Sequence, residues 1–556
     1  MERPISYIPM DRRQALYRGE KLPDPAHGAA LFADISGFTP LTERLVLDLG
    51  PQRGAEEVTK HLNRVYDGLV DELHRYGGSV ISFSGDAITC WLDGDNGFRA
   101  TSCALAMQAV MQQAQTIQVP SGEISLAMKT AVVVGTARRF LIGNPGVQLI
   151  EVLAGKTLDR LVEAEHEAQK GEVILDEATI DNLGPRVKIK AWRQGAVTGA
   201  QLGVVDSLEN MSIPAYWPPM PQDALDEAIT RRWLLPPVYK RLVEGGGEFL
   251  AELRPAVALF VRFSGIDYDD DEEAETKLDT FVQNVQEILS RYDSNLLQLT
   301  IGDKGSSLYA AFGAPFAHED DAVRAVNVAL EFQELAGRLS YISPLQIGIC
   351  QGRLRTGAYG GTTRRTYGAL GDAVNTAARL MQAAAPGQIL VAEATIKQTG
   401  EKFSREHLPP ITVKGKAEPV AVYAVSRRQT QSTIRLQEPQ YALPMVGRTA
   451  EQELIQEKMA EVKAGRGQVI TISGEAGIGK SRLVAQIIGL AGEQDFLGFG
   501  GECQSYGTNT SYLVWQRIWQ DFFELTPEMF AEAQIAHVAE HLQRINPALR
   551  DWFHCV

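Results

Sequence analysis

The sequence predicts an α+β protein in which one domain is written twice and a separate α/β unit follows. The first observation is a repeat: residues 31–38 read LFADISGF, and residues 259–266 read LFVRFSGI. The second is a repeat near the end of each copy, where 171–180 (GEVILDEATI) matches 387–396 (GQILVAEATI). The distance between copies is far longer than a solenoid period, so it indicates duplicated domains whose loops diverged.

The order of elements in the first copy supports the α+β class. Apolar runs and helical spacing alternate along it, with a helix break expected at Gly50-Pro51 and a tight turn at Ser84-Gly85-Asp86. The predicted strands cover 31–34, 79–83 and 87–92, and the predicted helices cover 44–75 and 95–115. A strand–helix–strand–strand–helix order is typical of a sheet covered by helices.

The domain organisation follows from the repeat and from composition shifts. The expected parts are a first domain at 24–205, a proline- and glycine-rich connector at 206–250, a second domain at 251–426, a polar linker at 427–443 and a third unit at 444–556.

Composition excludes several classes of protein. The hydrophobic fraction of 44% fits ordinary globular cores. The sequence contains no run of eighteen apolar residues, so no membrane-spanning helix is predicted. The first residues lack the apolar stretch of a signal peptide, and the five cysteines are too scattered for a disulfide framework, so the cytoplasm is the expected compartment. A net charge of −15 argues against nucleic acid as a partner.

Two aspartates follow predicted strands in the first copy. Asp34 ends an apolar strand, and Asp86 lies in the turn between two strands. Either one alone is also explained as a turn residue, because aspartate favours turns. Together they can face each other across a sheet edge and hold hard cations such as Mg²⁺ through oxygen ligands.

These stretches, FADISGFT at 32–39 and FSGDA at 83–87, resemble the metal-binding motifs of class III nucleotidyl cyclases. The resemblance implies that Asp34, Asp86 and the main-chain carbonyl of Ile35 hold two ions, Mg²⁺ or Mn²⁺, with ATP as substrate. It also implies two ferredoxin-like domains that pair as a pseudo-heterodimer, with the cyclase site formed within one chain.

The second copy carries the complementary signature. Asn375 and Arg379 are four residues apart in YGALGDAVNTAARL, so they share a face of a helix. The alternative is an ordinary alanine-rich helix with an exposed arginine. By the resemblance, Asn375 orients the ribose, Arg379 stabilises the transition state and Lys304 recognises adenine. Gly368 stands where the family has a threonine or aspartate that contacts the purine, which leaves base selectivity to Lys304 and main-chain groups.

Each copy lacks the other half of the site, so one competent site and one vestigial pocket are predicted. Arg262 replaces Asp34, and the counterpart of Asp86 is expected near Leu308. In the first copy Asp159 stands opposite Asn375 and Glu163 opposite Arg379, where a glutamate would repel a triphosphate.

This arrangement is similar to that of the soluble, bicarbonate-responsive adenylyl cyclases, which place bicarbonate in the vestigial pocket through a lysine and an arginine. The sequence has Ser82 and Val162 at those places, with Arg160 nearby. Bicarbonate is therefore an effector that the resemblance implies and these two residues do not support.

The third unit contains a phosphate-binding loop. Residues 474–481 read GEAGIGKS, after an apolar strand expected at 468–473 and before a helix, which is the context of a Walker A motif. Main-chain N–H groups around Gly474, Gly477 and Gly479 would cradle the phosphates of a second ATP, Lys480 would reach the β and γ oxygens, and Ser481 would bind Mg²⁺. About 75 residues follow the loop, so an incomplete P-loop domain is expected.

Three functions fit these residues. The leading one is an adenylyl cyclase that makes 3′,5′-cyclic AMP and pyrophosphate from ATP, for which Asp34, Asp86, Lys304, Asn375 and Arg379 speak. Gly368 motivates two alternatives: a catalytically weak pair of domains that senses nucleotide for the ATPase-like unit, and a guanylyl cyclase.

Overall fold

The structure is a computed structural model, and it divides into two units, residues 1–428 and 429–556. The residues it describes are 3–221, 224–243, 252–302, 306–400, 402–411, 419–428, 447–474, 479–501, 513–523, 525 and 531–546. Within these ranges, no helix has the length and apolar character needed to cross a membrane.

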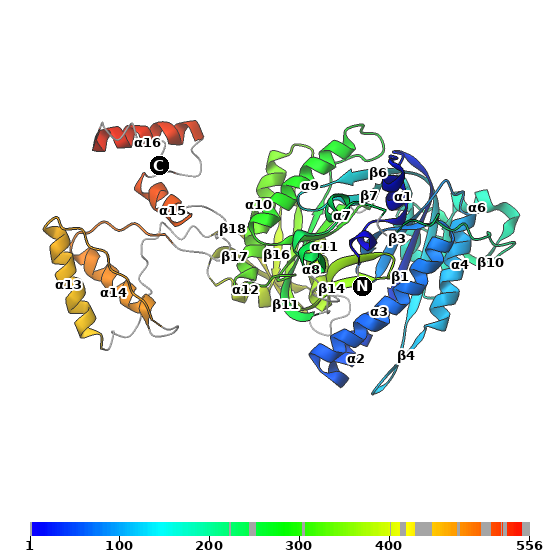
Figure 1. Ribbon diagram of the computed structural model, residues 1–556, viewed down its shortest axis with the longest axis horizontal. Coiled ribbons are helices and arrows are strands. Elements are labelled where there is room, and N and C mark those ends of the chain that lie inside the picture. The colour runs from blue at the N-terminus through cyan, green and yellow to red at the C-terminus, as the bar shows by residue number, and fades with distance from the viewer. Residues whose placement is uncertain are drawn as a thin grey trace. The chain divides into compact units, whose positions relative to one another are not determined.

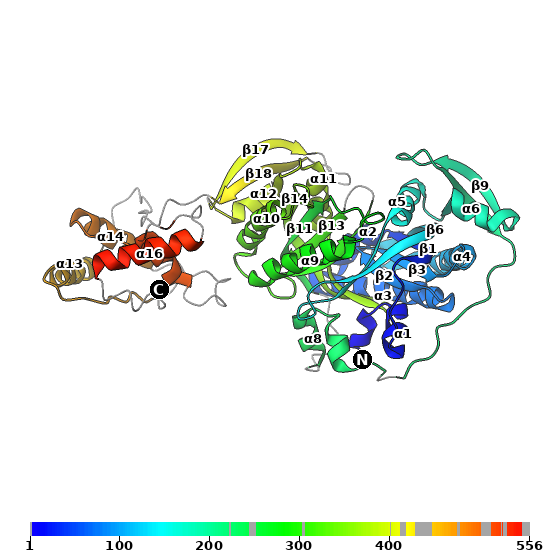
Figure 2. The ribbon, with the colours of Figure 1, turned by 90° about the horizontal axis from the view of Figure 1, so that it is seen from above.

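The first unit contains two sheets with the same strand order, which confirms the predicted α+β duplication (Figures 1 and 2). The first sheet runs β2-β3-β1-β6-β8-β10-β9, with β7 paired to β6. Its strands are β1 (Ala26–Ser36), β2 (Ser79–Ser84), β3 (Ala87–Asp93), β6 (Ala127–Ile142), β7 (Ile150–Ala154), β8 (Val173–Asp176), β9 (Val187–Gln194) and β10 (Gln201–Leu208). A separate hairpin joins β4 (Thr116–Val119) and β5 (Gly122–Ser125).

The second sheet repeats this order as β12-β13-β11-β14-β16-β18-β17, with β15 paired to β14. Its strands are β11 (Glu252–Phe263), β12 (Asn295–Thr300), β13 (Ser306–Phe312), β14 (Gln346–Gly360), β15 (Arg365–Leu370), β16 (Ile389–Ala392), β17 (Phe403–Ile411) and β18 (Val420–Arg428). Strand-for-strand correspondence lets positions in the two copies be equated by register.

Helices cover both sheets, and two more lie in the described part of the connector between the copies. Those of the first copy are α2 (Phe38–Leu49), α3 (Pro51–Arg75), α4 (Phe98–Gln113), α5 (Lys156–Glu167) and α6 (Glu177–Leu183). Those of the second copy are α9 (Ala274–Arg291), α10 (Asp321–Arg338), α11 (Asp372–Ala383) and α12 (Glu393–Gln398). Outside the copies lie η1 (Pro4–Tyr7), α1 (Met10–Arg18), α7 (Glu227–Arg231) and α8 (Pro236–Val243), and η2 (Gly184–Arg186) follows α6.

The predicted elements of the first copy are present. The expected break at Gly50-Pro51 separates α2 from α3, and the expected strands lie within β1, β2 and β3. The connector was expected to start at residue 206, but this position still lies inside β10. The strand continues to Leu208, because it pairs with β9 and completes the first sheet.

Strand β1 shows why Asp34 is available. Alternate side chains of a strand point to opposite faces, and Leu31 and Ala33 pack in the core under α3 and α4. Ala30 and Phe32 pack on the other face, in the cluster that includes Leu161 of α5. Asp34 continues that second alternation at the end of the strand.

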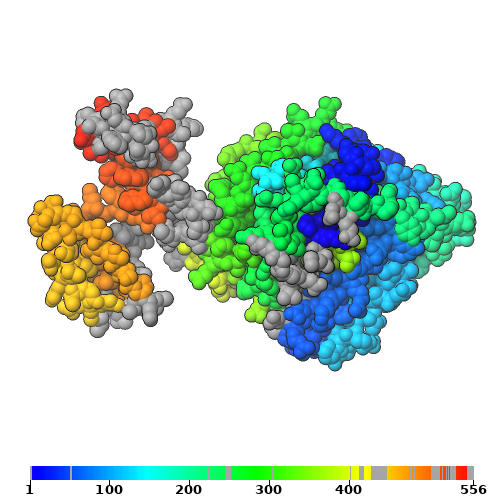
Figure 3. Space-filling view, in the orientation of Figure 1, coloured from blue at the N-terminus to red at the C-terminus, as the bar shows by residue number. Residues whose placement is uncertain are grey.

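The two copies are joined around a pseudo-twofold arrangement. Helix α3 of the first copy packs on β14 of the second, and α9 of the second packs on β6 of the first. The fully buried guanidinium of Arg364 donates to the carbonyl oxygens of Val80, Ile81 and Tyr7, at 3.0, 3.0 and 2.8 Å. In the space-filling view, the blue-to-cyan and green atoms of the two copies meet along a continuous surface (Figure 3).

The second unit contains, in its described residues, α13 (Thr449–Lys463), α14 (Lys480–Glu493), α15 (Leu513–Phe522) and α16 (Ala531–Ile545). The strand predicted at 468–473 was wrong, since these residues have no regular structure. A strand requires a partner for its main-chain hydrogen bonds, and none of the described residues of this unit pairs with that segment.

Candidate active site between the two copies

The predicted metal carboxylates lie next to each other in the first copy. Asp34 pairs with Ala87 across β1 and β3, and Asp86 immediately precedes Ala87 in the turn from β2. The N–H of Ile35 donates to the carbonyl oxygen of Asp86 at 3.3 Å, so the main chain of Ile35 runs beside the turn. Three oxygen-bearing groups predicted from sequence are therefore adjacent.

Electrostatics indicate what these carboxylates need. Burial, together with the nearby charge of Asp34, raises the pKa of Asp86 to about 6. Burial also raises the pKa of Asp34, an effect that the charge of Lys129 opposes. Like charges held together under partial burial are relieved by a cation between them.

The donor set fits a divalent cation whose shell is completed by substrate. Among the described residues, no cluster of three or more His, Cys, Asp and Glu side chains is placed to hold a metal. Mg²⁺ commonly uses only one or two carboxylates and takes its other ligands from water and phosphate oxygens. Asp34 and Asp86, with a main-chain carbonyl, match that pattern.

Lys129 is a site residue that the sequence reasoning missed. It lies opposite Asp34 in the pairing of β1 with β6, with its Nζ 3.7 Å from Asp34 Oδ2. The same ammonium group is paired with the carboxylate of Glu165 on α5. The strand pairing that brings Lys129 to Asp34 joins segments almost a hundred residues apart, so no local sequence motif predicts this contact.

A cavity of about 210 Å³ brings together residues of both copies. Asp86 and Gly85 come from the first copy, while Gly368 and Asn375 come from the second. Its remaining lining includes five aromatic residues, Phe83, Phe260, Tyr309, Tyr359 and Tyr367. A partly aromatic space beside a carboxylate and an amide suits a nucleobase and its ribose.

Gly368 has a packing reason inside this cavity. A Cβ atom at this position would lie 2.7 Å from Cε1 of Tyr359, so the tyrosine ring occupies the place of a side chain. Gln298 also lines the cavity and was missed by the sequence reasoning; its Nε2 donates to Ser84 Oγ at 3.1 Å and to Thr300 Oγ1 at 2.8 Å. An amide carries both a donor and an acceptor, which are the groups needed to read a base edge.

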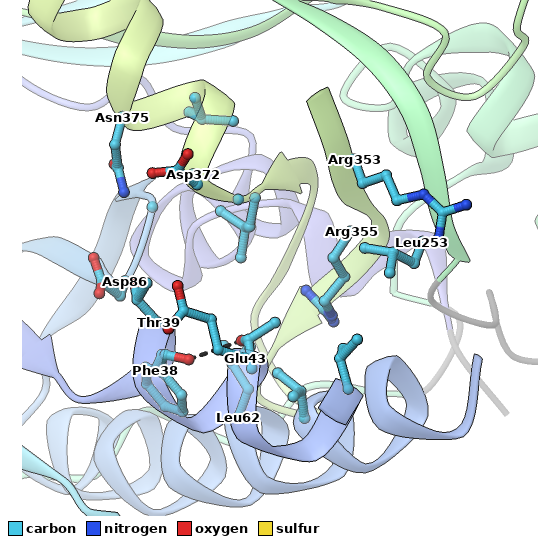
Figure 4. Close-up of a pocket in the computed structure, with 17 residues that line it drawn as sticks. Phe38, Thr39, Glu43, Leu62, Asp86, Leu253, Arg353, Arg355, Asp372 and Asn375 are labelled. Carbon is cyan, nitrogen blue, oxygen red and sulfur yellow. Dashed lines mark hydrogen bonds between the residues drawn. The ribbon is translucent and has the colours of Figure 1, made fainter. Parts of the chain in front are cut away.

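Helix α11 presents Asn375 and Arg379 differently. Asn375 lines the cavity near Asp86, and Figure 4 shows the two side chains on facing sides of the opening. Arg379 is exposed one turn further along, where its Nη1 donates to Gln382 Oε1 at 2.9 Å. The structure thus brings Asp86 and Asn375 together, and Arg379 is not among the residues that line the cavity. Lys304 lies outside the described residues.

In the other half of the unit, the described residues at the equivalent positions carry no carboxylate. Arg262 pairs with Ser307 as Asp34 pairs with Ala87, so the counterpart of Asp86 is Ser306. This position lies two residues before Leu308, near which the counterpart was expected. Ser306 Oγ is hydrogen-bonded to the hydroxyl of Tyr268 at 2.8 Å, which fills this position with protein.

One further residue in the other half of the unit also has structural partners. Glu163, expected to face a triphosphate, accepts from the N–H groups of Val197 and Thr198 at 2.9 and 2.7 Å. These bonds lower the pKa of Glu163 against the effect of burial. Glu163 therefore anchors the loop between β9 and β10.

The residues considered for an anion are not gathered in one place. Arg160 is ion-paired with Asp176 and donates to the carbonyl oxygen of Val134 at 2.8 Å. Ser82 lines a cavity of about 80 Å³, whereas Val162 lies against Gly302. Bicarbonate binding stays a prediction that this geometry does not support.

The phosphate-binding loop is described only at its ends. Gly479 has φ +91° and precedes α14, and Lys480 Nζ donates to the carbonyl oxygen of Gly474 at 2.9 Å. Gly477 and the side chain of Ser481 lie outside the described residues. The lysine that would meet phosphates is thus held over the loop, at the start of a helix.

Comparisons with known families place this geometry in a class. Residues 260–427 match the adenylate and guanylate cyclase catalytic domain, and residues 444–551 match the AAA ATPase domain. The second copy is therefore similar to a nucleotidyl cyclase catalytic domain, and the region that follows it is similar to an AAA ATPase domain. The first match contains Gly368, Asn375 and Arg379, and the second contains the phosphate-binding loop.

Individual relatives agree with this class. The chain is 23% identical to adenylate cyclase type 10 of Rattus norvegicus over 504 residues and to that of Homo sapiens over 505 residues. Both alignments cover 84% of this chain and 31% of the relative, so the chain spans about a third of these relatives' length.

Solved structures are similar at low identity. The adenylyl cyclase CyaB from P. aeruginosa is 23% identical, with 32% of this chain and 97% of that chain covered and a TM-score of 0.30. A class III adenylyl cyclase-like ATP-binding protein from Pseudomonas aeruginosa is 11% identical, with 67% and 85% covered and a TM-score of 0.46.

Proposed function

We propose that the chain is an adenylyl cyclase that converts ATP to 3′,5′-cyclic AMP and pyrophosphate at one asymmetric site between its two copies. The observation that carries this proposal is the shared cavity, in which Asp86 of the first copy faces Asn375 of the second. The curated relatives that bear the name adenylate cyclase type 10 support ATP as the nucleotide.

The first copy supplies the ion-binding half of the proposed site. Asp34 and Asp86, with the carbonyl of Ile35, would hold two Mg²⁺ or Mn²⁺ ions. Bound there, the ions would polarise the α-phosphate, favour loss of the 3′-hydroxyl proton and neutralise charge on pyrophosphate. Lys129, which contacts Asp34, is placed to exchange this carboxylate for a phosphate oxygen once a cation neutralises Asp34.

The second copy supplies the positioning half. Asn375 would hold the ribose so that its 3′-oxygen meets the α-phosphorus; the O3′–P bond forms as the bond to pyrophosphate breaks. Arg379, one turn away, would leave Gln382 and donate to α-phosphate oxygens as their charge grows. Gln298, main-chain groups near Gly368, and Lys304 would contact the base. A second ATP would bind the AAA domain at Lys480.

A nucleotide sensor without turnover is the second candidate. The observation that favours it is the ion pair of Lys129 with Asp34, which gives one metal carboxylate a protein partner. Guanylyl cyclase activity is the third reading, because Gly368 offers no side chain to choose between purines.

One assay separates the three. Purified full chain is incubated with Mn²⁺ and either ATP or GTP, and cyclic product is measured alongside nucleotide binding by calorimetry. Cyclic AMP as the main product, lost in Asp34→Ala, supports the proposal. Binding of ATP without product identifies a sensor, and preferential cyclic GMP identifies a guanylyl cyclase.

A further inference from the structure

A buried arginine between the two copies has no anionic partner. Arg355 on β14 is 3% exposed, and its Nε donates to Thr59 Oγ1 of α3 at 2.9 Å. Among the described residues, neither Nη1 nor Nη2 of Arg355 has a hydrogen-bond partner. A buried charge without a partner is costly, so the surroundings of this guanidinium require an explanation.

The guanidinium faces an apolar cavity of about 330 Å³. Leu253 and Leu370 lie directly opposite Arg355 on the flanking strands β11 and β15 and therefore share its face. Val58 and Leu62 of α3 close the cavity from the first copy. Figure 4 shows Arg355 reaching from β14 toward the helices that carry Glu43 and Leu62.

Arg355 stays charged in this setting. Burial lowers its pKa to about 10, and the hydroxyls of Tyr359 and Tyr66 are the groups whose charge acts on it. The carboxylates that also line the cavity lie elsewhere: Asp86 is at the catalytic end, and Glu43 and Asp372 are exposed. None of them forms an ion pair with Arg355.

The first copy contains the same arginine with its partners in place. Lys129 pairs with Asp34 as Gln346 pairs with Arg262, and nine residues further along each strand lie Arg138 and Arg355. Their partners across the next hairpin, Ala154 and Leu370, each directly precede the glycine before α5 or α11. The two arginines are therefore structural equivalents.

Arg138 shows what such an arginine binds. Its Nε donates to Asp24 Oδ1 at 2.9 Å and its Nη2 donates to Asp24 Oδ2 at 3.0 Å, a bidentate carboxylate pair. Its Nη1 donates to the carbonyl oxygen of Tyr268 at 3.0 Å. In the second copy, no described residue supplies the carboxylate that Asp24 supplies in the first.

We propose that the cavity at Arg355 binds a small amphipathic carboxylic acid, with its carboxylate on Nη1 and Nη2 of Arg355 and its apolar body against Leu253, Leu370 and α3. The fork of a guanidinium matches a carboxylate in two parallel hydrogen bonds. The apolar lining takes a chain or ring rather than a nucleoside. Without a metal ion at Asp86, a multiply charged phosphate is disfavoured because it adds negative charge near this carboxylate.

Occupancy of this site is coupled to the catalytic cavity. The two cavities share Gly85, Asp86, Leu370, Val374 and Asn375, and a ligand at Arg355 lies between α2–α3 of one copy and β14 of the other. A ligand that changes how these elements meet changes nucleotide affinity, and nucleotide changes the ligand's affinity by the same factor. The site itself does not depend on which nucleotide reaction is catalysed.

The test is direct binding to the full chain without nucleotide or metal. Octanoate, octan-1-ol and pyrophosphate are titrated separately in a calorimeter. Octanoate is expected to bind saturably and about tenfold to a hundredfold more tightly than octan-1-ol, the range of hydrogen bonds to a charged group. Equal binding of the acid and the alcohol, or no saturable binding of octanoate, overturns the proposal.

Matched variants locate the site. Arg355→Leu removes the charge, and Val46→Trp fills the apolar part of the cavity from α2; each should weaken octanoate binding at least about tenfold. Arg353→Leu removes an exposed arginine from the same lining and should leave it unchanged. Circular dichroism and thermal unfolding check that each variant folds.

The other possible results also support or exclude binding of the acid at Arg355. If Arg355→Leu does not fold, Arg355→Lys and Val46→Trp carry the test, with partial retention expected for lysine. Octanoate affinity that survives Arg355→Leu or Val46→Trp excludes this cavity. Pyrophosphate that binds more tightly than octanoate and depends on Arg355 assigns the arginine to a polyphosphate tail instead. A chain without cyclase activity that still binds octanoate at Arg355 separates this inference from the proposed function.

Discussion

The two copies use one pair of facing strand positions in opposite ways. In the second copy, β14 and β15 bring Gly357 opposite Gly368, beside a cavity that reaches the catalytic residues. In the first copy, β6 and β7 bring Phe140 opposite Val152, both buried. The same topology therefore leaves room for the Tyr359 ring beside a cavity where two side chains are missing, and makes a packed core where they are present.

The charged groups follow the same division. Asp34 and Asp86 form a half-buried acidic pair on the open side, and their equivalents Arg262 and Ser306 do not. The two equivalent arginines also differ in their partners. Arg138 is hydrogen-bonded to the carboxylate of Asp24, whereas Arg355 is hydrogen-bonded to no carboxylate among the described residues. A duplicated fold can thus concentrate its unsatisfied charges on one side, where ligands can meet them.

The largest expected effect is on the rate of cyclic nucleotide formation, and it distinguishes Asp86 from the equivalent Ser306. Asp86→Asn should reduce cyclic nucleotide formation by about a thousandfold or more, because it removes an ion ligand that acts in the transition state. The matched change Ser306→Ala, at the equivalent place, should leave the rate within about twofold. Initial rates with Mn²⁺ and saturating ATP measure both. Equal losses in the two variants would mean that the sites are not functionally distinct.

The second effect compares the two arginines by stability. Arg138→Leu should lower the free energy of unfolding by about 2 kcal/mol, because the partly exposed Asp24 loses its two hydrogen bonds to the guanidinium. Arg355→Leu should change it by less than about 1 kcal/mol in either direction, because no ion pair is lost and an unpaired buried charge is removed. Denaturant unfolding of the cyclase unit within the full chain measures both. A larger loss for Arg355→Leu would show that this arginine already has its partner.

The sequence predicted what depends on local pattern and missed what depends on register. The break at Gly50-Pro51 and the turn at Asp86 are written in neighbouring residues, so both could be predicted. Lys129 and Arg355 could not, because each acquires its role from a residue on a strand or helix far away in the chain. The strand expected at 468–473 failed for a related reason: apolar composition does not supply a pairing partner.

The third effect is a pH dependence of the acidic pair without metal. The pKa of Asp86 in the folded protein is raised to about 6 from 3.8, so the folded state holds this proton more tightly than the unfolded state does. Stability from this group is therefore present at low pH and declines as pH rises from about 4 to 6, by about 2 kcal/mol.

Chelated protein unfolded at several pH values should show that decline, and Asp86→Asn should remove it. Mn²⁺ should compensate for it above pH 6, where Asp86 is charged and the cation offsets the repulsion between Asp86 and Asp34. A decline that is the same in wild type and Asp86→Asn would place the titrating group elsewhere. No such dependence is expected from the other half of the unit, where Arg262 and Ser306 stand.

The smallest effect tests whether the missing side chain at Gly368 keeps the cavity open. Gly368→Val introduces the residue found at the equivalent position of the first copy, Val152. The new Cβ atom would lie 2.7 Å from the ring of Tyr359. Because the obstacle is a side-chain ring that can shift, the chain should fold, and KM for ATP should rise by about threefold to tenfold with a smaller change in kcat. Adding Tyr359→Leu should restore part of the affinity by returning the lost space. If Gly368→Val leaves KM unchanged while Tyr359→Leu raises it, the ring of Tyr359 is itself a base contact, and the opening between the strands is set by stacking rather than by the absence of a side chain.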